Sequence, residues 1–163
     1  MKKVIVAGSR SFNDYEVLKE NLDRLFITPV IVVSGCAKGA DTLGEQWANS
    51  HGYDIEKHPA DWKNLDVPIC RVKYNQHGAY NAMAGHNRNM EMLESVKNNP
   101  DRGCVVAFWD KKSAGTKNMI EIAEAVNIPV IIIGIKDLSI SYKNNINFQG
   151  DFWHHICQNS LLF

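Results

Sequence analysis

Four short apolar runs alternate along the chain with segments in which apolar residues recur at helical spacing. The runs cover residues 3–7, 30–33, 104–109 and 129–135, and a weaker one covers residues 53–58. Helical spacing is found in residues 15–25, 40–51, 87–96 and 116–126. It predicts that Met90 and Val126 face inward, and that Asn13 and Glu16 form a capping box at the first of these helices. Continuous apolar runs are typical of strands that helices cover on both faces. The alternation therefore predicts an α/β fold with a parallel sheet.

We predict a doubly wound sheet of about five strands in the order 3-2-1-4-5. At 163 residues, the chain fits one domain. Its core would span residues 3–135, and residues 136–163 would form a C-terminal extension that is polar and then aromatic. In such sheets the ligand lies beyond the carboxyl ends of the strands, where the strand order reverses. Here that point would lie between the first and fourth strands.

Three loops with small residues follow the predicted strands and precede helical segments. They are residues 8–11 (GSRS), 34–41 (SGCAKGAD) and 112–117 (KSAGTK). Small residues let the backbone approach a ligand, and the next helix offers free N–H groups with a partial positive charge. Three such loops at one sheet edge predict a single anionic ligand that resembles a nucleotide.

Several side chains in these loops have both a binding and a structural interpretation. Arg10 would pair with a phosphate in forked geometry, or bond to a neighbouring loop. Asp41 would accept a bond from a ribose hydroxyl, or favour its own helix dipole. Thr116 would help to hold a phosphate, or cap its helix. The candidate ligand-binding residues are Gly8, Ser9, Arg10, Ser11, Gly35, Lys38, Gly39, Asp41, Asn87, Arg88, Asp110, Ser113, Gly115, Thr116 and Lys117.

Residues 59–86 are the least regular part of the chain, and a loop of this length inside a domain is typically functional. Directly after them, Asn87, Arg88 and Asn89 would read a base edge or a phosphate, or form a plain polar helix start. Trp62, Trp109 and Tyr80 would stack on a base, although packing within the core or in a lid is the simpler role for each.

Composition excludes several function classes. Lys plus Arg equals Asp plus Glu at 18 each, so the chain lacks the basic excess of a duplex-DNA binder. It has neither a G-x-G-x-x-G fingerprint nor a Walker A motif, which argues against classical NAD oxidoreductases and P-loop NTPases.

Its histidines and four separated cysteines show no metal-site spacing, so we expect no metal and no cofactor. No leader or membrane-length apolar run is visible, and we expect a cytoplasmic protein with reduced thiols.

Five segments carry a distinctive combination of motifs: residues 4–10 (VIVAGSR), 34–41, 59–62 (PADW), 85–89 (GHNRN) and 108–116 (FWDKKSAGT). Together they resemble the SLOG superfamily, in particular its small YspA-like branch in bacteria and phages. The resemblance covers about residues 3–135. It implies a Rossmann-like fold and a nucleotide or nucleotide-derived ligand, bound by a sensor or a sequestering protein. It also implies a homo-oligomer, for which the aromatic tail (Phe152, Trp153, Phe163) would suit a subunit contact or a sheet edge.

Two other functions follow from the same superfamily. One is hydrolysis of nucleoside monophosphates, as in the Lonely Guy phosphoribohydrolases, whose Gly-Thr loop resembles Gly115 and Thr116 and whose helical arginine resembles Arg88. Their two glutamates are replaced here by Asn118 and Met119, so the resemblance implies binding without turnover unless Glu91 or Glu121 substitutes. The other is binding of single-stranded DNA, as in DprA, which the zero net charge disfavours.

Overall fold

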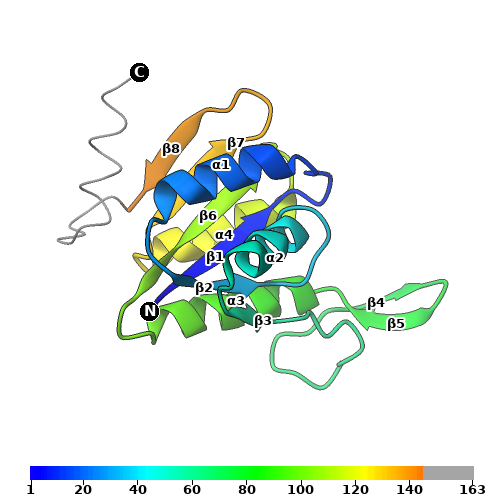
Figure 1. Ribbon diagram of the computed structural model, residues 1–163. Coiled ribbons are helices and arrows are strands. Elements are labelled where there is room, and N and C mark those ends of the chain that lie inside the picture. Colours follow the sequence, from blue (N-terminus) through cyan, green and yellow to red (C-terminus); the bar gives the residue numbers. More distant parts are fainter. Residues whose placement is uncertain (145–163) are drawn as a thin grey trace.

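The computed structural model describes residues 1–144 as a six-stranded sheet with two helices on each face (Figure 1). The strands of this sheet are β1 (Lys2–Gly8), β2 (Val30–Ser34), β3 (Ile55–Lys57), β6 (Gly103–Trp109), β7 (Val130–Gly134) and β8 (Ile140–Lys143). The helices are α1 (Tyr15–Leu25), α2 (Ala40–His51), α3 (Ala84–Lys97) and α4 (Ala114–Ala125). A separate hairpin pairs β4 (Val72–Asn75) with β5 (Gly78–Asn81). The aromatic residues of the predicted tail contact lie outside the described residues.

The predicted strand order is confirmed. The sheet runs β3-β2-β1-β6-β7-β8, so the first five strands of the wound sheet have the order 3-2-1-4-5. All pairs among them are parallel, whereas β8 adds an antiparallel edge strand that the sequence did not predict. The loops after β2, β1 and β6 therefore leave the same edge of the sheet from three adjacent strands.

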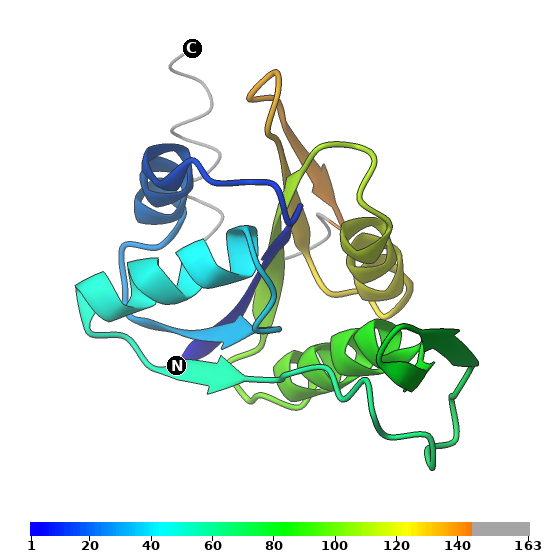
Figure 2. The same ribbon diagram turned by 90° about the vertical axis from the view of Figure 1, so that its right-hand side faces the viewer.

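Successive side chains of β1 point to opposite faces of the sheet, where they belong to two separate hydrophobic cores. Val4 and Val6 belong to the core beneath α1 and α2, and Ile5 and Ala7 belong to the core beneath α3 and α4. Figure 2 shows the two pairs of helices on opposite sides of the sheet. Because β1 is buried on both faces, its residues 4–7 are apolar without interruption.

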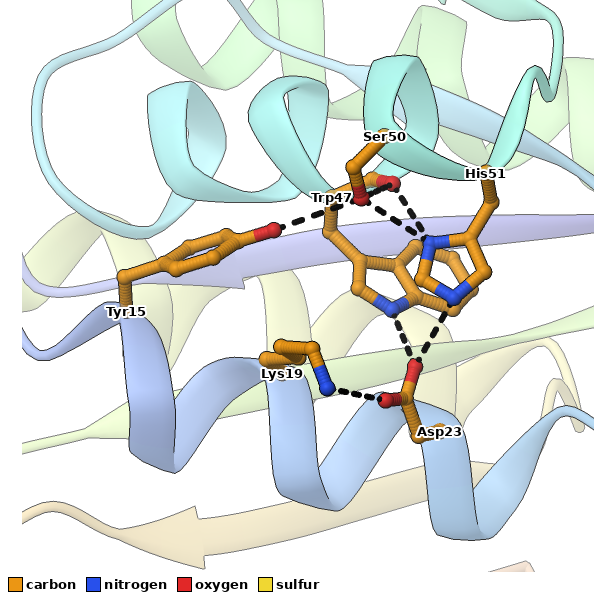
Figure 3. A network of polar contacts seen from close by, with 6 residues as sticks. All are labelled: Tyr15, Lys19, Asp23, Trp47, Ser50 and His51. Atoms are coloured by element: carbon orange, nitrogen blue, oxygen red, sulfur yellow. Dashed lines mark hydrogen bonds and ion pairs between the residues drawn. The ribbon is translucent and has the colours of Figure 1, made fainter.

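A polar cluster fastens α1 to α2 around a fully buried indole (Figure 3). Trp47 Nε1 donates to Asp23 Oδ1 at 2.7 Å, and His51 Nε2 lies 3.1 Å from the same oxygen. Lys19 Nζ donates to the other carboxylate oxygen at 2.8 Å. Burial acts to raise the pKa of Asp23, but the bonds from Lys19 and Trp47 outweigh it and lower the pKa. The cluster supplies the indole N–H with the acceptor that it needs in the core.

The segment between β3 and α3 is irregular, as expected, but it contains the unpredicted β4–β5 hairpin. The buried side chain of Asn81 organises it: Oδ1 accepts from the N–H groups of Arg71 (3.1 Å) and Met83 (2.9 Å). The Asn81 N–H donates to the carbonyl of Trp62 at 2.8 Å. Figure 1 shows the hairpin projecting beyond the start of α3. These bonds hold Trp62 and Met83 near each other at the sheet edge where the predicted loops meet.

Glu56 in β3 ties the sheet edge to α3 and to β1. Its carboxylate lies 2.6 Å from Lys3 Nζ and 2.7 Å from His58 Nε2, and it accepts a bond from the hydroxyl of Ser95. Burial acts to raise the pKa of Glu56, but the bonds from Lys3, Ser95 and His58 outweigh it and lower the pKa to about 2.

We expect the free energy of unfolding of Glu56→Gln to depend less on pH in the acid range than that of the wild-type protein. A carboxyl group with a lowered folded-state pKa adds stability above its unfolded value of about 4.3 and loses it as the pH falls towards 2. Since the group is partly exposed, we expect a wild-type advantage of roughly 1–2 kcal/mol at pH 6. Urea unfolding at pH 6 and pH 3 would measure it. An equal difference between the two proteins at both pH values would contradict the prediction.

Three local predictions were wrong. Helix α1 is capped by Asp14, whose Oδ1 accepts from Val17 N at 3.1 Å, rather than by a capping box of Asn13 and Glu16. Met90 and Val126, which helical spacing placed inward, are 44% and 38% exposed. The buried face of α3 instead follows residues 89, 92, 93 and 96, and Val126 lies past the end of α4. Within residues 1–144, no helix has the length and apolar character needed to cross a membrane.

Candidate functional site

A cavity of about 550 Å3 opens at the carboxyl ends of β1 and β6, between the first turns of α3 and α4. Its volume lies within the range of roughly 300–1,000 Å3 that small-molecule sites occupy. The strand order reverses between these two strands, which is where ligands bind in doubly wound sheets. We call it the main cavity. Seven predicted residues line it: Gly8, Arg10, Asp41, Arg88, Ser113, Gly115 and Thr116.

The first turn of α4 presents unpaired amide groups to the main cavity. Ser113 is the N-cap, but its hydroxyl accepts from the buried Thr116 hydroxyl at 3.0 Å and bonds to no backbone N–H. Asp110 Oδ1 accepts from the N–H groups of Lys112 (2.8 Å) and Ser113 (2.7 Å), which orders the loop. The N–H groups of residues 114–116 therefore have no acceptor within the described chain.

The first turn of α3 also lacks a cap. Met83 is its N-cap residue and supplies no side-chain bond, and Met83, Gly85 and His86 line the main cavity. Neither α3 nor α4 carries an acidic residue in its first turn, whereas α1, which is far from the cavity, has Asp14 and Glu16 there. The two helix dipoles thus add positive potential to this cavity, which Asp41 from the first turn of α2 opposes.

Asp41 and Arg88 form the boundary of the cavity beside the loop after β2. The Asp41 carboxylate is 6% exposed, and its Oδ2 accepts from Ala37 N at 3.3 Å. Burial raises the pKa of Asp41, although the Arg88 guanidinium and the loop N–H groups oppose this change. Arg88 Nη1 donates to the carbonyl of Gly35, where a side chain would overlap the guanidinium. Only glycine leaves room for this contact.

A chain of amides runs from Arg88 across the cavity to His86. Arg88 Nε donates to Asn89 Oδ1 at 3.0 Å, and Asn89 Nδ2 donates to Asn118 Oδ1 at 2.9 Å. Asn118 Nδ2 then faces His86 Nδ1 at 3.0 Å. The Arg88 guanidinium can only donate, so Asn89 presents its oxygen to Arg88 and its NH2 group to Asn118. Asn118 then presents its own NH2 group to His86, and Nδ1 of His86 must accept. The neutral His86 ring therefore carries its proton on Nε2, as a further donor for a ligand.

Arg10 is exposed at the rim, and its guanidinium has no hydrogen bond or ion pair within residues 1–144. Its loop is held by Gly39, which has a φ of +83° and packs against the backbone of Ser9 and Arg10. A left-handed backbone and close contact both favour glycine here. Gly39 thus joins the first two loops rather than facing the cavity.

The other predicted residues lie outside the main cavity. Ser9 is buried and its hydroxyl accepts from Asp110 N at 3.2 Å, so both of these residues order the loops. Asn87 donates to the carbonyl of Ile69 at 2.8 Å. Further residues that do not line the main cavity are Ser11, Gly35, Lys38, Lys117, Glu91 and Glu121, of which Glu121 pairs with Lys117 at 3.6 Å and Glu91 lies 3.8 Å from His58.

Sequence reasoning missed His86, Asn89 and Asn118 as one connected set. Asn89 and the adjacent arginine stood out as a polar helix start, and Asn118 stood out as the replacement of a glutamate, but nothing in the sequence linked them. Trp62 lines the main cavity, and its stacking on a base stays a prediction, whereas Trp109 Nε1 donates to the carbonyl of Ser113 at 3.2 Å. Among the described residues, no group of three or more His, Cys, Asp or Glu could hold a metal ion.

Comparisons with known proteins agree with this architecture. The sequence model of the YspA, cpYpsA-related SLOG family matches residues 2–65. The gene 61 protein of Mycobacterium phage D29 is 31% identical over 144 residues, which cover 83% of this chain and 99% of that protein. The X-ray structure of DNA processing protein A (DprA) from Streptococcus pneumoniae superposes with a TM-score of 0.59 at 21% identity. That alignment covers 98% of this chain but 56% of the DprA chain.

Proposed function

Because the chain belongs to the YspA, cpYpsA-related SLOG family, we propose that it binds a nucleotide or a nucleotide-derived molecule in the main cavity. The phosphate would lie on the N–H groups of residues 114–116, with Arg10 and Arg88 supplying charge. His86 Nε2 would donate to the ligand, and Asp41 would accept from a sugar hydroxyl. Trp62 would stack on the base. The three free thiols of the described residues suit the reducing cytoplasm in which such a protein would sense or sequester its ligand.

The observation that carries this proposal is the pair of uncapped helix starts. A serine N-cap ordinarily satisfies an N–H group of its own helix, and losing such a cap costs about 1 kcal/mol. Helices α3 and α4, whose first turns line the main cavity, lack this bond, whereas the distant α1 has it. Helix α2 also lacks it, and its first-turn residue Asp41 lines the cavity as well. Unpaired amides that face a cavity are the groups that bind phosphate in other helix-start sites.

The carboxylates of the site favour binding over hydrolysis. Breaking an N-glycosidic bond requires a carboxylate that stabilises the developing cation or activates water. Glu91 and Glu121 do not line the main cavity. Asp41 is the one acidic residue among those that do, and Arg88 and the loop amides already engage it. Incubation with nucleoside monophosphates should therefore release no free base, which chromatography would detect.

Calorimetry with the four ribonucleoside 5′-monophosphates tests the proposal. We expect at least one to bind, and Arg10→Ala to weaken it roughly 10- to 100-fold, since a charge-assisted bond contributes about 1.5–3 kcal/mol. Arg24→Ala is the matched control, because Arg24 is also exposed but lies in the last turn of α1. Absence of binding at millimolar ligand, or equal effects of the two variants, would overturn the assignment. Salt-sensitive retention of a labelled oligonucleotide instead would indicate a DNA-binding protein.

A further inference from the structure

A second cavity of about 320 Å3 adjoins the main cavity and has a different chemical character. Arg10, Ala37, Trp62 and Arg88 line both cavities, so the two meet at these residues. The second cavity is otherwise enclosed by the loop after β2, including Gly35 and Lys38, and by Pro59 and Ala60. We call it the side cavity. Since the main cavity already has the volume of a small-molecule site, the side cavity offers room for one further group.

The side cavity is lined by cations, and none of its lining residues is acidic. Arg10, Lys38 and Arg88 supply three positive charges, of which that of Arg88 is partly balanced by Asp41. Asp41 lines the main cavity but not this one. Arg10 and Lys38 are exposed and form no ion pair with the described chain, so their charges are not neutralised there. Arg88 uses Nε and Nη1 for Asn89 and Gly35, which leaves Nη2 free to donate.

Two further acids near the side cavity do not line it. Glu45 accepts from Ser34 at 2.6 Å and pairs with Lys57 at 2.7 Å. Asp61 lies between Ala60 and Trp62 in the chain but does not line the side cavity. Because Arg10 and Lys38 have no acidic partner among the described residues, an anionic occupant would offset their charges, which a neutral one would not. A dianionic group would accept a forked bond from Arg10 and a bond from the free Nη2 of Arg88.

We propose that the ligand carries a second phosphoryl group, which lies in the side cavity among Arg10, Lys38 and Arg88. This inference rests on the proposed function, in which the first phosphate occupies the start of α4. The ligand class is therefore a nucleotide with two phosphoryl groups, either contiguous as a 5′-diphosphate or separate as a 3′,5′-bisphosphate. Arg10 and Arg88 face both cavities and so contact both groups, whereas Lys38 faces only the second.

The test measures an affinity ratio. For the ribonucleoside whose 5′-monophosphate binds best, calorimetry would compare that monophosphate with the 5′-diphosphate and the 3′,5′-bisphosphate. We expect one doubly phosphorylated probe to bind at least tenfold more tightly than the monophosphate, and the better probe identifies how the two groups are linked. Lys38→Ala should lower this ratio severalfold, while Arg10 and Arg88 retain part of the increase. Lys97→Ala should preserve it, since Lys97 is also exposed but ends α3, roughly 18 Å along the helix from its first turn.

The outcomes separate this inference from the proposed function. If no probe binds, the proposed function fails. If the monophosphate binds and neither second phosphate increases affinity, the proposed function stands and the side cavity assignment fails. The assignment also fails if Lys38→Ala leaves the increase undiminished. Because Lys38 is exposed and unpaired within residues 1–144, its removal should leave the unfolding transition unchanged, which circular dichroism would check.

Discussion

Gly115→Asp is expected to weaken nucleotide binding at least 100-fold while leaving the fold as stable as before. Gly115 occupies the second position of α4, lines the main cavity and has open space where a side chain would start. A carboxylate there would favour the helix dipole by about 0.3–1 kcal/mol. The same charge about 4 Å from a bound phosphate would repel it by up to roughly 4 kcal/mol at an effective dielectric of 20. Binding and folding should therefore respond in opposite directions.

Calorimetry and urea unfolding of the same preparations would measure both effects. Gly115→Asn is the matched control, since it has nearly the same shape without the charge and should weaken binding much less. Equal losses of affinity in the two variants would show that bulk, not charge, disturbs the site. Unchanged affinity in Gly115→Asp would remove the phosphate from the start of α4.

Trp47→Ala is expected to lower the free energy of unfolding by about 3–5 kcal/mol, because it removes the largest fully buried side chain from the core beneath α1 and α2. Such a loss is a large share of the total of roughly 5–15 kcal/mol that is typical of a domain. The indole also packs against the rings of Phe26, His51 and Tyr53 in tilted or edge-on contacts, and these rings would border the cavity left behind.

Trp47→Phe separates packing from the polar cluster of Figure 3. It keeps an aromatic ring but removes the donor to Asp23, which retains Lys19 and His51. We expect a smaller cost of about 1–3 kcal/mol. Chemical denaturation of the three proteins at pH 7 would measure the series. A phenylalanine variant as unstable as the alanine variant would mean that the hydrogen bond, and not the volume, dominates at this position.

The wound sheet was predictable because its signals are local. Strands buried on both faces must be continuously apolar, as residues 4–7 and 130–133 are, and parallel neighbours require helical connections. The β4–β5 hairpin was not predictable for the opposite reason. Every residue of β4 is exposed, so its short alternation of Val72 and Tyr74 with polar residues faces no core and does not distinguish it from a loop. The bonds of the buried Asn81 to distant backbone groups organise this segment instead.

The candidate site likewise has parts that local sequence signals predict and parts that depend on contacts between distant residues. The loops after three strands were predictable because glycine and small residues at strand ends have a local meaning. The direction of the amide chain from Arg88 to His86 was not, since it depends on which atoms meet across α3 and α4. Likewise, Ser113 would ordinarily be taken for a helix cap, and only the contact with Thr116 shows that its hydroxyl is engaged elsewhere.

Because the first turns of α3 and α4 leave backbone amides unpaired, a ligand that binds to them should raise the melting temperature of the protein. Free protein leaves these amides without partners, so an occupant at a hundred times its dissociation constant should add about 2.7 kcal/mol to the folded state. For a domain of this size, that corresponds to a midpoint roughly 5–10 °C higher. Melting curves recorded against a metabolite library would therefore single out the natural occupant without any assumption about its chemistry.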